Sequence, residues 1–134
     1  MEMARLLRLV ERQFTQRIAT ELESAGATVE QWRALNLLAD GVGHPMSQVA
    51  EHVLLAAPTT TKLVDGLVAQ ALVYRRIDDT DRRRVLIFLS ARGRTALRRW
   101  NAAAARAHTT LESEAGSDDL TQLAELLTRL SARI

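Results

Sequence analysis

The sequence predicts a mainly α-helical fold with one β-hairpin, built as a single domain. The chain has 134 residues, of which 47% are hydrophobic and 25% are charged. These values are typical of one globular domain with one core. Apolar residues recur three or four positions apart along most of the chain, which indicates amphipathic helices. Between residues 73 and 89 the apolar spacing changes to two, which indicates a pair of strands.

The first two helices are predicted from apolar spacing and from a capping motif. Apolar residues line one face from Met3 to Leu22, and Ser24 to Gly26 end this helix. Thr28, followed three residues later by Gln31, has the pattern of a capping box and predicts the start of a second helix. We expect the second helix to run to Leu38.

Two short helices joined by a tight connection are expected next. Ser47 is a candidate N-cap for a helix over residues 48–55. A fourth helix is predicted from about Pro58 to Ala71, because proline is tolerated in the first turn of a helix. Its expected buried side carries Leu63, Val64 and Leu67.

The hairpin and two further helices complete the chain. The strands are expected over residues 73–77 and 85–89, joined by a turn rich in arginine. Ser90 is the expected cap of a long helix that ends at Gly116, and a last helix starts at Ser117. This last helix has a heptad-like apolar seam made of Leu120, Leu123, Leu127, Leu130 and Ile134.

The charge of the chain is unevenly distributed. The formal net charge is only +2. The segment from Arg75 to Arg99, however, contains nine arginines and three aspartates, a net charge of +6, and leaves −4 for the rest. A basic lobe of this kind is typical of nucleic-acid binding, with a solvated arginine-rich face as the alternative.

Several classes of protein are excluded or not indicated by the composition. The absence of cysteine excludes disulfides, thiol nucleophiles and thiolate metal sites. The longest apolar runs, Val53–Ala57 and Val85–Leu89, are too short to span a membrane. With no signal-type apolar stretch at the start, we expect a cytoplasmic protein with no membrane partner.

Neither a metal site nor an enzyme is predicted. His44, His52 and His108 are the three histidines, and only His108 has a ligand-like neighbour one helical turn away, Glu112. No second ligand pair lies near it, so we expect no metal. No combination of nucleophile, base and orienting residue is evident either.

Three stretches of the sequence resemble the MarR family of bacterial transcription regulators. Residues 78–84, Asp-Asp-Thr-Asp-Arg-Arg-Arg, followed by Leu-Ser-Ala-Arg-Gly at 89–93, are similar to the wing signature of that family. Residues 61–65, followed by 72–76, resemble its recognition helix and first wing strand. Residues 31–35 resemble its second helix. The sequence departs from the family at Leu54 and Ala71, where glycine is usual, and at Ala56, where serine or threonine is usual.

The resemblance implies a winged helix-turn-helix over residues 28–90 and a homodimer. Residues 1–24 and 91–134 would form the dimerisation helices, which interlock with those of a second copy. An intramolecular bundle of these helices is the alternative. The expected dimerisation positions are Leu7, Val10, Phe14, Leu120, Leu123, Leu127 and Leu130.

The resemblance also implies a repressor that binds a pseudo-palindromic site in double-stranded DNA. Helical spacing places Thr59 and Lys62 on the outward side of the fourth helix, where they can enter a major groove. By resemblance, Arg83 in the hairpin turn reads a minor groove and Asp81 orients it. The candidate DNA-binding residues are Pro58, Thr59, Thr61, Lys62, Asp65, Arg75, Arg76, Asp81, Arg82, Arg83 and Arg84.

An effector is the last implication of the resemblance. Many relatives respond to small phenolic or aromatic acids, bound in the crevice between the dimerisation helices and the winged domain. Phe14, Trp32 and His52 are the candidate lining residues, and no cofactor is expected. A function of a different class is an interaction module whose arginine-rich lobe docks on an acidic protein. Affinity for duplex DNA distinguishes the two functions.

Overall fold

The computed structural model describes residues 1–134 and is mainly helical, as predicted. Its elements, in chain order, are α1 (Met3–Ser24), α2 (Val29–Leu38), β1 (His44–Pro45), α3 (Met46–Val53), α4 (Ala57–Ala69), β2 (Val73–Ile77), β3 (Val85–Leu89), α5 (Ala91–Ala115) and α6 (Ser117–Arg133). None of the helices combines the length and the apolar character that crossing a membrane requires.

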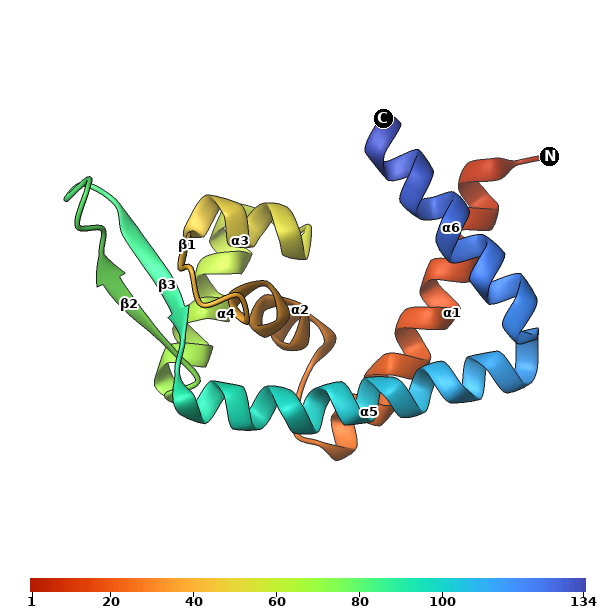
Figure 1. Ribbon diagram of the computed structural model, residues 1–134, viewed down its shortest axis with the longest axis horizontal. Coiled ribbons are helices and arrows are strands. Elements are labelled where there is room, and N and C mark those ends of the chain that lie inside the picture. Colours follow the sequence, from red (N-terminus) through yellow and green to blue (C-terminus); the bar gives the residue numbers. More distant parts are fainter.

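The long helix α5 connects two parts of the molecule (Figure 1). Helices α2, α3 and α4 and the sheet lie beside its N-terminal half, and the β2–β3 hairpin projects from that end. Helix α1 packs on α5, and α6 and both chain termini lie at the end of the molecule away from the hairpin. The molecule therefore has a winged part and a separate part built from α1 and α6.

The sheet has three antiparallel strands in the order β1-β3-β2. The two strands predicted from sequence form the hairpin with the expected bounds, and Val73 pairs with Leu89. Strand β1 was not predicted, because two residues are too short to show a period. It pairs with β3 through His44, which lies opposite Ile87. This pairing ties the connection between α2 and α3 to the middle of β3.

Two of the expected helix caps are present. The Thr28 hydroxyl accepts a hydrogen bond from the Gln31 N–H at 3.2 Å. The Gln31 side chain accepts one from the Thr28 N–H at 3.0 Å, which completes the capping box. The Ser90 hydroxyl accepts from the Gly93 N–H at 2.9 Å and so caps α5. Each cap satisfies backbone donors that a helix start leaves free.

The predicted cap of α3 is wrong. This helix starts at Met46 after Pro45, so Ser47 lies inside the first turn and makes no capping hydrogen bond. The pairing of His44 and Pro45 with β3 keeps the backbone extended up to Pro45. The helix therefore begins directly after the strand, two residues earlier than residue 48.

The two positions where the MarR family usually has glycine adopt the left-handed backbone conformation. Leu54 has φ 58° at the end of α3, and Ala71 has φ 59° after α4. Side chains are disfavoured there by roughly 1–2 kcal/mol. The turns are thus kept in shape by the surrounding structure, despite the unfavourable residues.

The core lies in the winged part and includes the last turns of α1. Its largest fully buried hydrophobic residues are Leu22, Leu35, Leu38, Val49, Val64, Leu67 and Ile87. Helix α5 comes very close to the start of β2, because a Cβ at Gly93 would lie 2.1 Å from the Leu72 carbonyl oxygen. Glycine is required there by space, and this close approach fixes α5 against the winged part.

The first half of α1 and the second half of α6 leave large apolar side chains exposed. These are Met3, Leu6, Leu7, Leu9, Leu126, Leu127 and Leu130. An apolar hollow of about 610 Å³ lies between the two helices. Contiguous exposed apolar surface of this kind is typical of an interface.

Candidate nucleic-acid interface

Helix α4 presents one buried side and one exposed side, as its spacing predicts. Thr60 is fully buried with Val64 and Leu67. Its hydroxyl donates to the Ala56 carbonyl at 3.0 Å, which satisfies the only buried polar residue of the core. The opposite side exposes Pro58, Thr59, Thr61, Lys62 and Asp65. This exposed side is available to a partner.

The start of α4 has no side-chain cap. Ala56 is the N-cap residue and makes no capping hydrogen bond, and Pro58 has no N–H to offer. The N–H groups of Ala57 and Thr59 therefore stand at the positive end of the helix without a side-chain acceptor. An anion such as a phosphate can take this role.

Asp65 on the exposed side of α4 forms an ion pair with Arg75 of β2. The Arg75 Nη2 donates to Asp65 Oδ1. The pair joins the helix to the first strand of the hairpin and neutralises a carboxylate that would repel phosphates. Asp65 is therefore paired with Arg75 in this structure. Helical spacing alone does not reveal this contact, because the two residues belong to different elements.

The turn between β2 and β3 is closed by its own hydrogen bonds. The Asp78 N–H donates to the Arg84 carbonyl at 2.9 Å. The Asp78 side chain accepts from the backbone and hydroxyl of Thr80. The hydrogen bond from the Thr80 backbone N–H contributes most to holding the pKa of Asp78 below its ordinary value. The Thr80 hydroxyl and the charge of Arg84 lower this pKa further. The turn thus keeps its shape with the carboxylate charged.

Arg83 is held at the tip of this turn by Asp81. The Asp81 Oδ1 accepts from the Arg83 backbone N–H at 3.1 Å and from its Nε at 3.2 Å. The Arg83 side chain remains 93% exposed. Arg82 and Arg84 are exposed and form no ion pair, whereas Arg76 lies 3.7 Å from Asp79. The turn therefore presents one oriented guanidinium group between two free ones.

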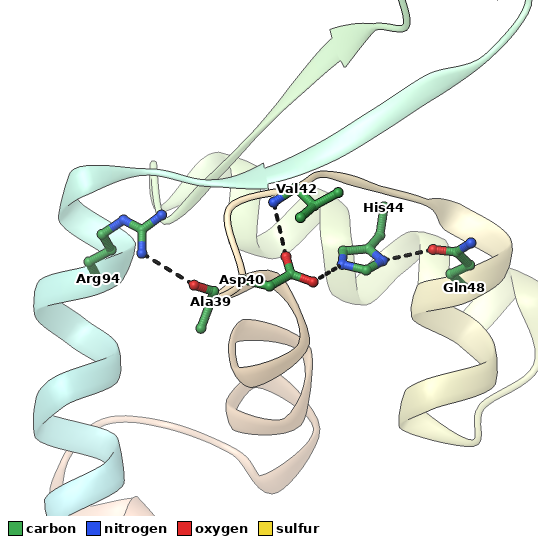
Figure 2. Close-up of polar contacts among 6 residues, drawn as sticks. All are labelled: Ala39, Asp40, Val42, His44, Gln48 and Arg94. Atoms are coloured by element: carbon green, nitrogen blue, oxygen red, sulfur yellow. Dashed lines mark hydrogen bonds and ion pairs between the residues drawn. The ribbon is translucent and has the colours of Figure 1, made fainter.

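The connection between α2 and α3 contains a polar cluster that was not predicted from the sequence (Figure 2). The His44 ring lies between two oxygens, with Nε2 2.7 Å from Asp40 Oδ2 and Nδ1 2.7 Å from Gln48 Oε1. The other Asp40 oxygen accepts from the Val42 N–H at 3.0 Å. Both ring nitrogens lie next to oxygen acceptors, an arrangement that favours the charged imidazolium, in which both nitrogens donate.

Opposing effects set the two pKa values of this cluster. Burial lowers the pKa of His44, but the hydrogen bonds to Gln48 and Asp40 and the Asp40 charge together raise it above its ordinary value. The backbone hydrogen bond from Val42, with the help of His44, holds the pKa of Asp40 below its ordinary value despite burial. Asp40, His44 and Gln48 follow one another at intervals of four residues. This spacing was a signal in the sequence that could have predicted the cluster.

Arg94 attaches the same connection to α5 (Figure 2). Its Nη1 donates to the Ala39 carbonyl at 3.4 Å, at the end of α2. A Cβ at Gly41 would lie 3.4 Å from Arg94 Nη2. A Cβ at Gly43 would overlap the Phe88 ring at 2.4 Å, and that ring stacks on Tyr74. The hairpin therefore rests on this connection through direct packing.

Two of the three candidate effector residues line a common hollow. It has a volume of about 390 Å³ and is lined by Phe14, Ile18, Trp32, Asn101, Ala104, Ala105, His108 and Leu111. Trp32 Nε1 donates to Asn101 Oδ1 at 2.8 Å. His52 is exposed on α3 and is not among the lining residues. His108 pairs with Glu112 at 2.7 Å, and no three ligand-type side chains meet in one place.

The expected dimerisation residues fall into two groups. Leu7, Val10, Phe14, Leu123 and Leu127 line the apolar hollow between α1 and α6. Leu120 is buried within the chain, and Leu130 is exposed near the end of α6. The single chain therefore covers only part of the seam.

The fold and this surface define the class of the protein as a winged helix-turn-helix protein. Residues 25–84 match the model of the MarR family. This segment is therefore similar to the winged helix-turn-helix of the MarR family, and the whole chain has the fold of solved regulators of that family. The family consists of transcription regulators.

Solved structures share the fold over almost the whole chain. The MepR–DNA complex of S. aureus is 24% identical, with a TM-score of 0.79, and the match covers 100% of this chain and 99% of that one. A MarR-family transcriptional regulator from Rhodococcus sp. RHA1 is 23% identical, with a TM-score of 0.89, over 99% of this chain and 94% of that one.

A third similar structure is the transcriptional repressor CouR bound to a 23-mer DNA duplex. It is 22% identical, with a TM-score of 0.84, and the match covers 94% of this chain and 89% of that one. No curated protein sequence matches the chain.

Proposed function

We propose that this protein represses transcription by binding a pseudo-palindromic DNA site as a homodimer. The observation that carries the proposal is the tip of the hairpin, where Asp81 holds the 93% exposed Arg83. An arginine ordered in this way can enter a narrow minor groove without first losing much side-chain freedom. Arg82 and Arg84 on either side can neutralise phosphates.

Helix α4 supplies the base-reading part of the proposal. Thr59 and Lys62 are exposed on the side opposite the core, and Lys62 can donate to guanine or to a phosphate. The uncapped start of α4 can bind a phosphate with the N–H groups of Ala57 and Thr59. MepR and CouR, which share the fold, have been solved with DNA, and this supports the proposal.

The homodimer rests on the apolar surface of α1 and α6. The exposed side chains of Leu6, Leu7, Leu126, Leu127 and Leu130 belong to these two helices. Helix α6 and both chain termini lie at the end of the molecule away from the hairpin (Figure 1). A second copy can cover them with its own α1 and α6. A two-fold dimer then presents two α4 helices, which fits two half-sites of one DNA site.

The proposed regulation is by a small aromatic effector in the hollow at Phe14 and Trp32. This hollow lies among α1, α2 and α5, which link the two parts of the molecule. Its lining is mostly apolar and includes two polar residues, Asn101 and His108. Occupation of the hollow would favour one placement of the winged parts in the dimer over another.

Selection of bound sequences from a random duplex pool tests DNA binding. We expect enrichment of one pseudo-palindromic sequence and an affinity that falls with rising salt. Failure to enrich any sequence, together with no salt-dependent duplex affinity, would overturn the proposal. It would favour an acidic protein partner for the arginine-rich lobe instead.

A further inference from the structure

A hollow at the junction of α4 and α5 is separate from the surfaces described above. It has a volume of about 420 Å³ and lies where α4 ends, α5 begins and the turn between α1 and α2 passes. Its lining residues are Ala25, Gly26, Gln70, Leu72, Arg92, Thr95, Ala96, Arg99 and Trp100. The chain has two tryptophans. Trp100 lines this hollow and Trp32 lines the hollow at Phe14, so each tryptophan marks a different hollow.

The hollow is positively charged and contains no carboxylate. Arg92 and Arg99 both line it, and neither takes part in an ion pair or a side-chain hydrogen bond. Their neighbours Arg94 and Arg98 do make hydrogen bonds. Arg92 also stands in the first turn of α5, where the helix dipole favours an anion over a cation. Two unpaired cations in one concave surface attract a negative ligand.

Trp100 provides an independent observation. It is only 2% exposed, and its Nε1–H is the one buried side-chain polar atom without a hydrogen-bond partner. Buried donors are almost always bonded. Because Trp100 also lines the hollow, its indole, whose N–H no group of the chain engages, reports locally on what binds there.

From these observations we propose that the hollow binds a small organic dianion, either a phosphate monoester or a dicarboxylate. Arg92 and Arg99 stand seven residues apart on α5, about 10 Å along its axis, so both lie on the same face of the helix and line the hollow. Leu72, Ala96 and Trp100 offer apolar surface for the carbon body of the ligand. The volume suits a small molecule.

The ligand would contact the elements that carry the winged part. Gln70 is the C-terminal cap residue of α4, and Arg92 and Arg99 belong to α5. A bound dianion therefore bridges the end of α4 and the start of α5. This site is distinct from the hollow at Phe14 and Trp32, and its proposal does not depend on DNA binding.

Two probes and the two indole groups test the proposal. Phenyl phosphate and glutarate are titrated into the full chain by calorimetry, with butyrate as the probe that has one charge. The indole N–H signals in ¹H–¹⁵N spectra, assigned with Trp32→Phe, report the two hollows separately. We expect saturable binding of at least one dianion. The Trp100 signal should shift while the Trp32 signal stays unchanged. If glutarate binds, butyrate should bind at least about tenfold more weakly than glutarate.

Charge variants identify the site. Arg92→Gln and Arg99→Gln are each expected to weaken dianion binding about tenfold. The matched control, Arg12→Gln, removes an exposed and unpaired arginine of α1 and is expected to change binding less than about twofold. Binding of phenyl phosphate alone assigns a phosphate monoester, and binding of glutarate alone assigns a dicarboxylate. No saturable binding of either dianion, a shift at Trp32 instead, or unchanged affinity in both variants would overturn the proposal.

Discussion

The His44 ring and the Asp40 carboxylate lie 2.7 Å apart and join the end of α2 to strand β1. The ring also contacts Gln48 of α3, so three successive elements meet at one imidazole. Arg94 of α5 and Phe88 of β3 pack against the same connection. The charge of His44 is therefore expected to affect the stability of the winged part.

Stability should depend on pH through His44. The pKa of His44 is raised in the folded chain, so its contribution is complete below about pH 6.5 and is lost as pH rises through the folded pKa. His44→Asn should lower the free energy of unfolding at pH 5.5 by about 1–3 kcal/mol, since hydrogen bonds to charged groups are lost. The measurement is urea unfolding of both proteins from pH 5.5 to 8.5.

The difference between wild type and His44→Asn should shrink as pH rises. His52→Gln is the control, because His52 is exposed and has no hydrogen-bond partner in the structure. It should change stability by less than about 0.5 kcal/mol. A difference for His44→Asn that stays constant over the pH range would contradict a charged ring.

Base reading by α4 is tested at Lys62 and Thr59. Each alanine variant should weaken binding of the selected duplex by roughly 1–3 kcal/mol, because good base contacts are lost. Binding of a scrambled duplex should change less. Equal losses on both duplexes would assign these residues to phosphate contacts, and no loss on either would remove α4 from the interface.

The orienting role of Asp81 gives a prediction opposite to that of charge alone. Asp81→Ala removes a negative charge near DNA, yet it should weaken binding of duplex DNA, because Arg83 loses its acceptor. The loss of affinity should be smaller than that caused by Arg83→Ala. Arg82→Ala is the comparison, since loss of one phosphate contact should reduce the salt slope by about one. Duplex affinities are measured over a salt series. Tighter binding by Asp81→Ala would reject the orienting role.

Dimerisation is tested at Leu127, which is 44% exposed in the single chain. Leu127→Asp places a carboxylate in the proposed apolar interface, where burial without a partner is costly. The monomer fraction should rise in sedimentation at several concentrations. A wild-type chain that stays monomeric at micromolar concentration would show that α1 and α6 do not form the interface.

Two helical glycines should respond to alanine with opposite signs. At Gly93 the added methyl would lie 2.1 Å from the Leu72 carbonyl oxygen, so α5 must move and stability should fall by about 1–3 kcal/mol. At Gly66 nothing lies within 4 Å, so Gly66→Ala should raise stability by about 0.5–1 kcal/mol. Thermal and urea unfolding measure both. A stabilising Gly93→Ala would contradict the close packing of α5.

Local signals predicted most of the elements, and contacts between elements account for what was missed. The capping box of Thr28 and the period-two runs of the hairpin gave bounds that the structure confirms. Strand β1 and the start of α3 depend on pairing with β3, which is distant in sequence. In the same way, spacing placed Asp65 on the exposed side of α4 but did not reveal its partner Arg75 on β2.

The continuity of α5 has a geometric consequence for recognition. Its 25 residues extend about 37 Å without interruption, from the residue after the hairpin to the turn before α6. If α6 is fixed in a dimer, a tilt of α5 by about 5° displaces the hairpin end by about 3 Å, close to the rise of one base pair. The packing angle at the apolar end would thereby set which half-site spacing the two hairpins can span.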